Sequence, residues 1–318
     1  MKPRVYIDGD VGTTGLRIRS WLGERADIEI ARLPEAQRKD PAARREQILQ
    51  ADVTVLCLPD EAAREAAAWA AGKRVRLIDA STAHRVADGW VYGLPELCAQ
   101  QRQRIGGAAL VTNPGCYASA FILLVRPLID VGLMSADVSP AVHALSGYTG
   151  GGRALIERWE NPELGLASLP FEAPYALTRV HKHVPEMMRY GGLRVEPQFA
   201  PAVGPFRCGM RLQVALPKTS LPPRTDATAI WEALRDRYAS EPFVRVADLR
   251  LMDEPNERLF DPRRCNDTNR IELYVLAHPS GHVTLMSILD NLGKGAAGTA
   301  IQSLNLMLGL EESTGLPR

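Results

Sequence analysis

Apolar residues in the first 116 positions fall into short runs that alternate with stretches of helical spacing. The runs begin at residues 4, 28, 53, 75 and 109. The stretches between them, such as DEAAREAAAWAAG at 60–72, repeat apolar residues with the period of a helix. Strands that alternate with helices in this way predict a parallel sheet covered by helices.

The pattern changes after about residue 135. Longer β-rich runs follow, among them MRLQVALP from residue 210 and RIELYVLAHPSGHVTLMSIL from residue 270. Residues 278–281, HPSG, predict a turn between two antiparallel strands. The second half therefore predicts an α+β domain, and the glycine-rich segment NLGKGAAGTA opens a final amphipathic helix that we expect to return to the first domain.

Length and composition narrow the class of protein. A chain of 318 residues suggests two domains, and 38 basic against 37 acidic residues leave a net charge of +1, which favours neither nucleic acid nor an anionic membrane as partner. No apolar stretch resembles a signal peptide or a membrane span. The five cysteines are scattered without a C-x-x-C pair. We therefore expect a cytoplasmic protein that acts on a small molecule.

A glycine turn lies between the first strand and the first helix. Gly9, Gly12 and Gly15 are three residues apart, with Thr13 and Thr14 between the last two. A strand, a glycine turn and a helix together form the element that binds dinucleotide phosphates in Rossmann folds, where backbone amides at the helix N-terminus receive the pyrophosphate. A tight turn without a ligand is the alternative, since the spacing is not the usual G-x-G-x-x-G.

The end of the second predicted strand bears on the choice of cofactor. That strand finishes Ala31-Arg32-Leu33 and meets no carboxylate until Glu35. An acidic residue at this place binds the ribose of NAD, whereas an arginine suits the 2′-phosphate of NADP. Arg32 therefore favours NADP, although a single arginine is also compatible with an ordinary solvated charge.

The segment Asn113-Pro114-Gly115-Cys116-Tyr117 places a thiol where a strand ends and a helix begins. A helix N-terminus stabilises a thiolate, and Pro and Gly make the turn that presents it at the carboxyl edge of the sheet. Cys116 is thus the candidate nucleophile. A small buried side chain is the alternative for Cys116, and we expect no role for the other four cysteines.

A cysteine nucleophile needs a proton acceptor, and HKHVPE at 181–186 provides candidates. We interpret the segment as extended, with His181 and His183 on one side and Glu186 three residues later, so that His183 and Glu186 form an acid/base pair. A zinc site is the alternative, but a third strong ligand is missing nearby, and we expect no metal.

A second glycine-rich turn, SGYTGGGR at 146–153, follows the apolar run SPAVHAL. It lacks the Gly-Lys-Ser/Thr ending of a P-loop, which disfavours ATP. Its amides, Ser146 and Arg153 are suited to a substrate phosphate or an oxyanion, and a bare structural loop is the alternative.

Several of these motifs, in this order, resemble the N-acetyl-gamma-glutamyl-phosphate reductase family in its short form. The resemblance runs nearly from end to end. Besides the glycine turn it includes DASTAHR at 79–85, YGLPEL at 92–97, NPGCYAS at 113–119, SGYTGGGR at 146–153, HKHVPE at 181–186 and DNLGKGAAGTAIQSLNLMLG at 290–309.

The resemblance implies NADPH-dependent reduction of N-acetyl-gamma-glutamyl phosphate to N-acetyl-L-glutamate 5-semialdehyde and phosphate, in arginine biosynthesis. Cys116 would form a thioester, and His183, oriented by Glu186, would exchange the protons. The substrate contacts implied are Ser146, Gly147, Tyr175 and His181, and the second glycine turn adds Arg153 to them. The further cofactor contacts implied are Ser81, Asn291, Gly293 and Lys294.

We therefore expect an NADP-binding Rossmann-type α/β domain from residues 1–115 and 290–318, and an α+β substrate and oligomerisation domain from 116–289. The enzyme would be a homo-oligomer, a dimer or tetramer. Three alternatives remain: an aspartate-semialdehyde dehydrogenase, whose cysteine normally follows Asn directly; a reductase of a phosphorylated amino acid on a carrier protein; and a nucleotide-binding regulator without catalysis.

Overall fold

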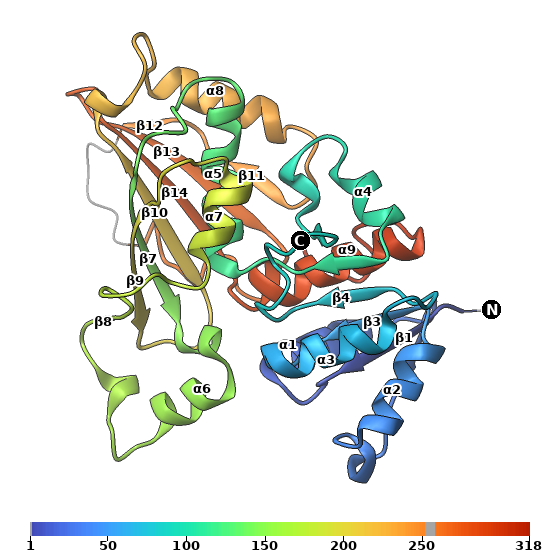
Figure 1. Cartoon of the computed structure of the whole chain (residues 1–318). Coiled ribbons are helices and arrows are strands. Elements are labelled where there is room, and N and C mark those ends of the chain that lie inside the picture. Colours follow the sequence, from blue (N-terminus) through green and yellow to red (C-terminus); the bar gives the residue numbers. More distant parts are fainter. Residues whose placement is uncertain (1, 252–257) are drawn as a thin grey trace. The chain divides into compact units, whose positions relative to one another are not determined.

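The computed structural model describes residues 2–251 and 258–318 (Figure 1). The chain divides into two compact units. The first consists of the residues up to Pro114 together with Ala296–Leu316, and the second of Gly115–Gly295 together with Pro317–Arg318. The first unit resumes at Ala296. Asp290 lies in the second unit, where its carboxylate accepts the amide of Asp267 at 2.9 Å.

The first unit is built on a six-stranded sheet in which every neighbouring pair is parallel. The expected parallel sheet, and with it the Rossmann-type α/β class, is confirmed. In spatial order its strands are β2 (Glu29–Ala31), β1 (Arg4–Asp8), β3 (Val53–Leu56), β4 (Leu77–Asp79), β6 (Leu110–Thr112) and β5 (Val91–Tyr92).

Helices of this unit pack against the sheet (Figure 1). They are α1 (Thr13–Leu22), α2 (Pro41–Gln50), α3 (Asp60–Ala70), α4 (Gln101–Gly107) and α9 (Gly298–Leu308). The last of them confirms the expected return of the C-terminal helix to the first unit.

The expected amphipathic character of α9 is wrong, because nearly all of this helix is buried. Its polar residues are paired inside the unit rather than exposed to water. Gln302 donates to Glu96 at 3.0 Å, and Asn305 donates to the carbonyl oxygen of Thr314 at 3.0 Å. Buried polar groups are tolerated when they have such partners.

The second unit is built on an eight-stranded mixed sheet, which confirms the expected α+β character. The expected turn at 278–281 joins the antiparallel strands β13 and β14, and the amide of His278 donates to the carbonyl oxygen of His282 at 3.0 Å. In spatial order the strands are β11 (Val244–Val246), β13 (Ile271–Ala277), β14 (Val283–Leu289), β10 (Met210–Leu216), β7 (Ala141–Gly147), β9 (Gln198–Gly204) and β8 (Ala173–Pro174), with β12 (Arg250–Leu251) also paired to β13.

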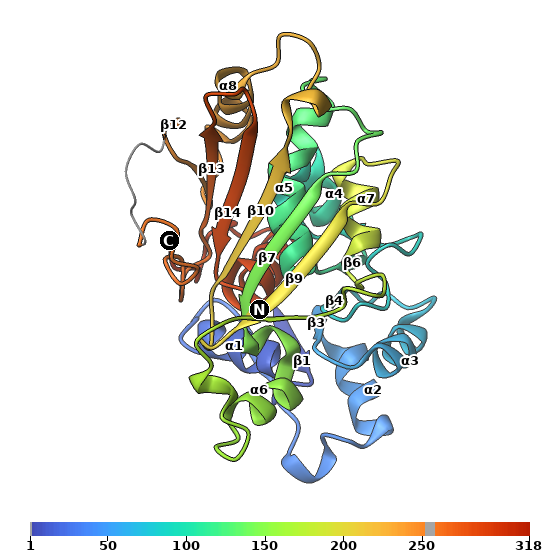
Figure 2. The ribbon, with the colours of Figure 1, turned by 90° about the vertical axis from the view of Figure 1, so that its left-hand side faces the viewer.

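Three helices of the second unit lie on one face of this sheet (Figure 2). They are α5 (Cys116–Asp130), α7 (Val184–Gly191) and α8 (Ala227–Tyr238), while α6 (Gly152–Glu160) follows the second glycine turn. The middle of α5 is almost entirely apolar and buried, so it serves as the centre of the core. The Tyr238 hydroxyl donates to the carbonyl oxygen of Leu123 at 2.8 Å and so joins α8 to α5.

Among the residues that the structure describes, no helix has both the length and the apolar character needed to cross a membrane.

Candidate active site

Cys116 is the first residue of α5, as the sequence predicts. Gly115 stands at the N-cap in an extended conformation and provides no side chain to cap the helix. The amide of Gly115 donates to Oε2 of Glu186 at 2.9 Å, and that carboxylate is only 1% exposed. The positive end of the helix dipole is therefore directed at the thiol, and a buried carboxylate holds the turn that precedes it.

The expected extended conformation of the HKHVPE segment is wrong. The amide of Val184 donates to the carbonyl oxygen of His181 at 2.9 Å, so the two histidines lie in a turn, and α7 begins at Val184. Pro185 explains the difference, because proline in the first turn of a helix needs no amide partner and has the backbone angle that a helix requires. Glu186 is thereby placed in the first turn of α7.

The structure brings both histidines together with Tyr117, the residue after Cys116. The ring of Tyr117 lies 5.7 Å from that of His181, 5.6 Å from that of His183 and 5.3 Å from that of Phe199, measured between centroids. The two histidine rings are 4.8 Å apart. His183 therefore lies beside the turn that carries Cys116, as an acid/base group would; its pairing with Glu186 stays a prediction.

Two tyrosine hydroxyls join this cluster. Tyr175 lies 3.4 Å from the Tyr117 hydroxyl and 3.3 Å from Nε2 of His181. Burial, the neighbouring Tyr175 and the charge of Cys116 raise the pKa of Tyr117 well above its ordinary value. Burial, with a further contribution from Cys116, raises the pKa of Tyr175 to about 12. Both phenols are therefore neutral in the working range of pH.

Sequence reasoning missed Gly295, which packs against the candidate nucleophile Cys116. A Cβ atom added at this position would lie 2.7 Å from Cβ of Cys116. Gly295 belongs to a π-helical turn, Gly293–Ala297, in which its amide donates to the carbonyl oxygen of Asp290 at 2.9 Å. The run of glycines in LGKGAAG was the available signal, since such turns occur often at functional sites.

The loop after β7 is held in place by Asn291. Its side chain donates to Oγ1 of Thr149 at 3.0 Å and accepts the amide of Gly209 at 2.8 Å. Ser146 is the buried penultimate residue of β7, and its hydroxyl donates to the carbonyl oxygen of Gly147 at 3.1 Å. Asn291 thus fixes the loop that follows the expected substrate contacts Ser146 and Gly147 at the end of β7, and its expected contact with the cofactor stays a prediction.

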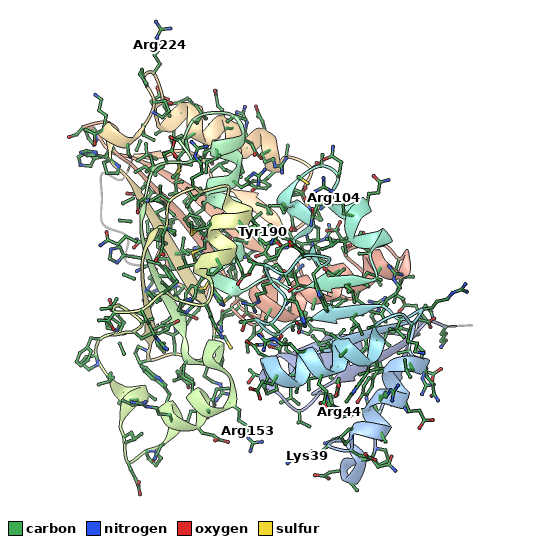
Figure 3. All side chains as sticks on the ribbon, in the orientation of Figure 1. Lys39, Arg44, Arg104, Arg153, Tyr190 and Arg224 are labelled. Carbon is green, nitrogen blue, oxygen red and sulfur yellow. The ribbon has the colours of Figure 1, made fainter. Side chains whose placement is uncertain are left out.

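Three further expected contacts lie in the second unit. Arg153 points away from α6 into solvent (Figure 3), with its side chain 79% exposed and 2.7 Å from Glu157. Lys294 is fully buried, with Nζ 5.9 Å from the centroid of the Phe243 ring. Gly293 is required by packing, because an added Cβ would lie 2.3 Å from the carbonyl oxygen of Thr268.

The glycine turn of the first unit has the geometry of a phosphate site. Gly9 has a φ of +86°, and an added Cβ would lie 2.3 Å from the carbonyl oxygen of Cys57. An added Cβ at Gly15 would lie 2.5 Å from the carbonyl oxygen of Gly9. Gly12 is the N-cap of α1, and Thr13 and Thr14 open the helix without a side-chain cap from the described residues. The amides of this first turn therefore remain suited to a pyrophosphate.

Three arginines lie near this turn or after the second strand. Arg32 directly follows β2 and is exposed. Arg38, which sequence reasoning missed, has Nε 3.9 Å from Asp10 of the glycine turn, and Arg19 has Nη1 3.1 Å from the same carboxylate. The positive charge expected from Arg32 near the cofactor turn therefore comes from several arginines.

Ser81 supports the loop after β4. Its hydroxyl donates to Oδ2 of the buried Asp79 at 2.8 Å and accepts the amide of Ala83 at 3.1 Å. Nδ1 of His84 lies 2.6 Å from the same Oδ2. The loop is therefore rigid at the carboxyl edge of the sheet, where open α/β folds bind their ligands.

Comparison with known proteins gives two family matches. A family described as semialdehyde dehydrogenase, NAD binding domain, matches residues 29–105, and one described as semialdehyde dehydrogenase, dimerisation domain, matches residues 116–291. The first supports a nicotinamide dinucleotide as cofactor, and the second supports the formation of oligomers.

Curated relatives match over nearly the whole chain. "N-acetyl-gamma-glutamyl-phosphate reductase 2" of Pseudomonas putida is 46% identical over 98% of this chain and 99% of its own length. The reductase of Trichormus variabilis is 43% identical over 99% of both chains, and that of Chelativorans sp. is 44% identical over 97% and 99%.

Solved structures share the fold. Aspartate semialdehyde dehydrogenase II of Vibrio cholerae, complexed with ASA, superposes with a TM-score of 0.72 over 97% of this chain and 99% of its own, at 16% identity. The aspartate semialdehyde dehydrogenase of Francisella tularensis gives 0.68 over 97% and 100%, at 17% identity. At these identities the likeness concerns the fold alone.

Proposed function

Because this chain belongs to the N-acetyl-gamma-glutamyl-phosphate reductase family, we propose that it reduces N-acetyl-gamma-glutamyl phosphate to N-acetyl-L-glutamate 5-semialdehyde and phosphate, in arginine biosynthesis. The observation that carries the proposal is the thiol of Cys116 at the start of α5, with His183 packed beside the same helical turn. A thiol next to an imidazole at a helix N-terminus is suited to attack an acyl phosphate.

The residues of the second unit would carry the acyl group through the reaction. The thiolate of Cys116 attacks the acyl carbon, the carbon–oxygen bond to phosphate breaks, and a thioester remains on Cys116. NADPH, when bound, supplies the hydride that reduces this carbonyl carbon. His183 gives a proton to the oxygen of the resulting hemithioacetal and takes it back as the carbon–sulfur bond breaks, which releases the aldehyde and the thiolate.

The glycine turn of the first unit fits a dinucleotide, because neither Gly9 nor Gly15 has room for a side chain and the first turn of α1 is uncapped. Gly9, Gly12, Gly15 and the amides of Thr13 and Thr14 would hold the pyrophosphate. We propose NADP in preference to NAD because basic residues, Arg32 first among them, follow β2 where NAD enzymes carry a carboxylate.

We also propose that the protein works in the cytoplasm as a homo-oligomer, a dimer or tetramer, assembled through the second unit. The match of that unit to a dimerisation domain supports assembly. Sedimentation velocity at several protein concentrations measures the state, and a monomer at all of them would contradict it.

The test of the function is acyl-phosphate-dependent oxidation of NADPH by wild-type protein, Cys116→Ser and Cys98→Ser. Cys116→Ser should lose turnover while its affinity for NADPH, measured by fluorescence titration, stays unchanged. Cys98→Ser is the matched control and should retain turnover. Unchanged turnover of Cys116→Ser would refute the covalent mechanism.

The reverse reaction tests substrate and cofactor together. N-acetylglutamate semialdehyde and phosphate are supplied with NADP or with NAD, and reduced cofactor is followed by absorbance. We expect a signal with NADP and a weaker one with NAD. No signal with either cofactor would contradict the proposed substrate, and a stronger signal with NAD would contradict the proposed cofactor.

A further inference from the structure

A chain of hydrogen bonds in the second unit begins at the backbone of His183. The amide nitrogen of His183 lies 3.2 Å from Nδ1 of His181. A backbone N–H can only donate, so Nδ1 of His181 is the acceptor and carries no proton. The neutral ring must then carry its proton on Nε2, which is 3.3 Å from the Tyr175 hydroxyl and donates to it.

The direction of the remaining bonds follows from this first one. The Tyr175 hydroxyl, which accepts from His181, donates to the Tyr117 hydroxyl at 3.4 Å. At the far end the Ser146 hydroxyl uses its proton on the carbonyl oxygen of Gly147. The side chains of Tyr117 and Ser146 are hydrogen-bonded as well, and this bond acts to lower the pKa of Tyr117. The first three bonds run in one direction, from the amide of His183 through His181 and Tyr175 to Tyr117.

These hydrogen bonds occupy the ring nitrogens of His181, which was expected to contact the substrate. Both of its ring nitrogens are committed, one to a backbone donor and one to a tyrosine. A second proton on the ring would place an N–H against the N–H of His183. Three of the four linking side chains, those of Tyr117, His181 and Ser146, are less than one-tenth exposed, and in such surroundings an unpaired polar group is costly.

Tyr117 connects the chain to the nucleophile. It follows Cys116 directly in the first turn of α5, and its ring is enclosed by His181, His183 and Phe199. A shift of its hydroxyl would therefore move the turn that carries the thiol. Sequence reasoning gave Tyr117 no role, because it looked like an ordinary helical residue after the cysteine.

We propose that Tyr117 and His181 are positioning residues: the directed chain fixes the first turn of α5 with Cys116, and it leaves His183 as the imidazole that exchanges protons. This inference rests on the proposed reductase activity. It assigns His181 to the support of the nucleophile rather than to the substrate.

The test compares four variants in steady-state kinetics. Tyr117→Phe keeps the ring but breaks the chain, and we expect kcat to fall about tenfold to a hundredfold with little change in KM, as for a misplaced reacting atom. Tyr238→Phe is the matched control, because it too removes a buried hydroxyl bonded to α5, at Leu123, and it should retain kcat. If Tyr117→Phe and Tyr238→Phe have the same kcat, the proposal is overturned.

Two substitutions at His181 separate positioning from substrate binding. The amide N–H of His181→Gln can replace Nε2–H as donor to Tyr175, so this variant should retain most of kcat, whereas His181→Ala should lose as much as Tyr117→Phe. If both variants instead raise KM by about tenfold or more with kcat preserved, His181 contacts the substrate and the proposal fails. Equal loss of kcat in both would also contradict it.

A spectroscopic readout is independent of turnover. Nitrogen NMR of histidine-labelled wild-type protein should show His181, assigned by its loss in His181→Gln, with Nδ1 unprotonated and Nε2 protonated. The opposite tautomer would overturn the chain. If the wild-type protein lacks turnover but shows the expected tautomer, the proposed function fails while the hydrogen-bond chain stands.

Discussion

Gly295 offers the sharpest perturbation of the nucleophile that leaves its chemistry intact. In Gly295→Ala the new methyl group would lie 2.7 Å from Cβ of Cys116, 3.0 Å from Cδ1 of Leu289 and 3.1 Å from the carbonyl oxygen of Asp290. Two carbon atoms rest at about 3.5–4.0 Å, so one side must retreat by about 1 Å. Leu289 and Asp290 are fully buried, which leaves Cys116 as the side that can yield.

A displacement of about 1 Å at a reacting atom costs up to about a hundredfold in rate. We therefore expect Gly295→Ala to lower kcat by about tenfold to a hundredfold, and crowding of the core to lower the free energy of unfolding by about 1–3 kcal/mol. The rate at which iodoacetamide alkylates Cys116 should change in the same direction as kcat. Stopped assays of turnover, alkylation followed by mass spectrometry, and urea unfolding measure the three effects.

The control is Gly107→Ala at the end of α4, where no atom lies within 4 Å of the added Cβ. It should keep wild-type kcat and alkylation rate and gain a little stability, up to about 1 kcal/mol, because alanine is the better helix former. If Gly295→Ala retains both rates of the wild type, the thiol is not confined by this turn, and the reasoning from packing is refuted.

Two further predictions concern the cofactor turn and the acid limb of stability. Gly9→Ala should abolish NADPH binding in fluorescence titrations, because its Cβ would lie 2.3 Å from the carbonyl oxygen of Cys57 and its φ is +86°; an unchanged dissociation constant would contradict the role of the turn. Burial opposes ionisation of Glu272, but the bonds from Tyr274 and Arg264 outweigh it and hold the pKa of Glu272 below its ordinary value. Its stabilising contribution is therefore present above the unfolded-state pKa, near pH 4.5, and is lost as pH falls through the lower folded-state pKa. As pH falls, Glu272→Gln should lose less free energy of unfolding than the wild type does, as measured by urea titrations. An equal loss in the two proteins would contradict this prediction.

Features with local signals could be predicted from the sequence. The turn at Pro114 and Gly115 and the apolar run after it are adjacent, so the start of α5 at Cys116 was readable from a few residues. The glycine turn at Gly9 and the hairpin at 278–281 are equally local. In each case the conformation is dictated by proline or glycine within the segment itself.

Features that depend on distant partners could not be predicted. The carboxylate of Glu186 accepts the amide of Gly115, 71 residues away, and nothing near either residue indicates this bond. The polar residues of α9 looked like a solvent-exposed face, because sequence does not reveal that Gln302 meets Glu96 inside the unit. The conformation of the HKHVPE segment is a different case, because its signal is local. Pro185 indicates the start of a helix, but the alternating histidines led to the interpretation of an extended segment.

The division of the chain into two units has a consequence for how such an enzyme changes over generations. Cys116, His183, Glu186 and the tyrosines beside them all belong to the second unit, and the glycine turn for the nucleotide belongs to the first. Substitutions around the glycine turn that alter how the nucleotide is held can therefore accumulate in the first unit while the acyl-transfer residues in the other stay as they are. A chimera that takes residues 2–114 and 296–316 from a relative would replace the first unit in a single experimental step.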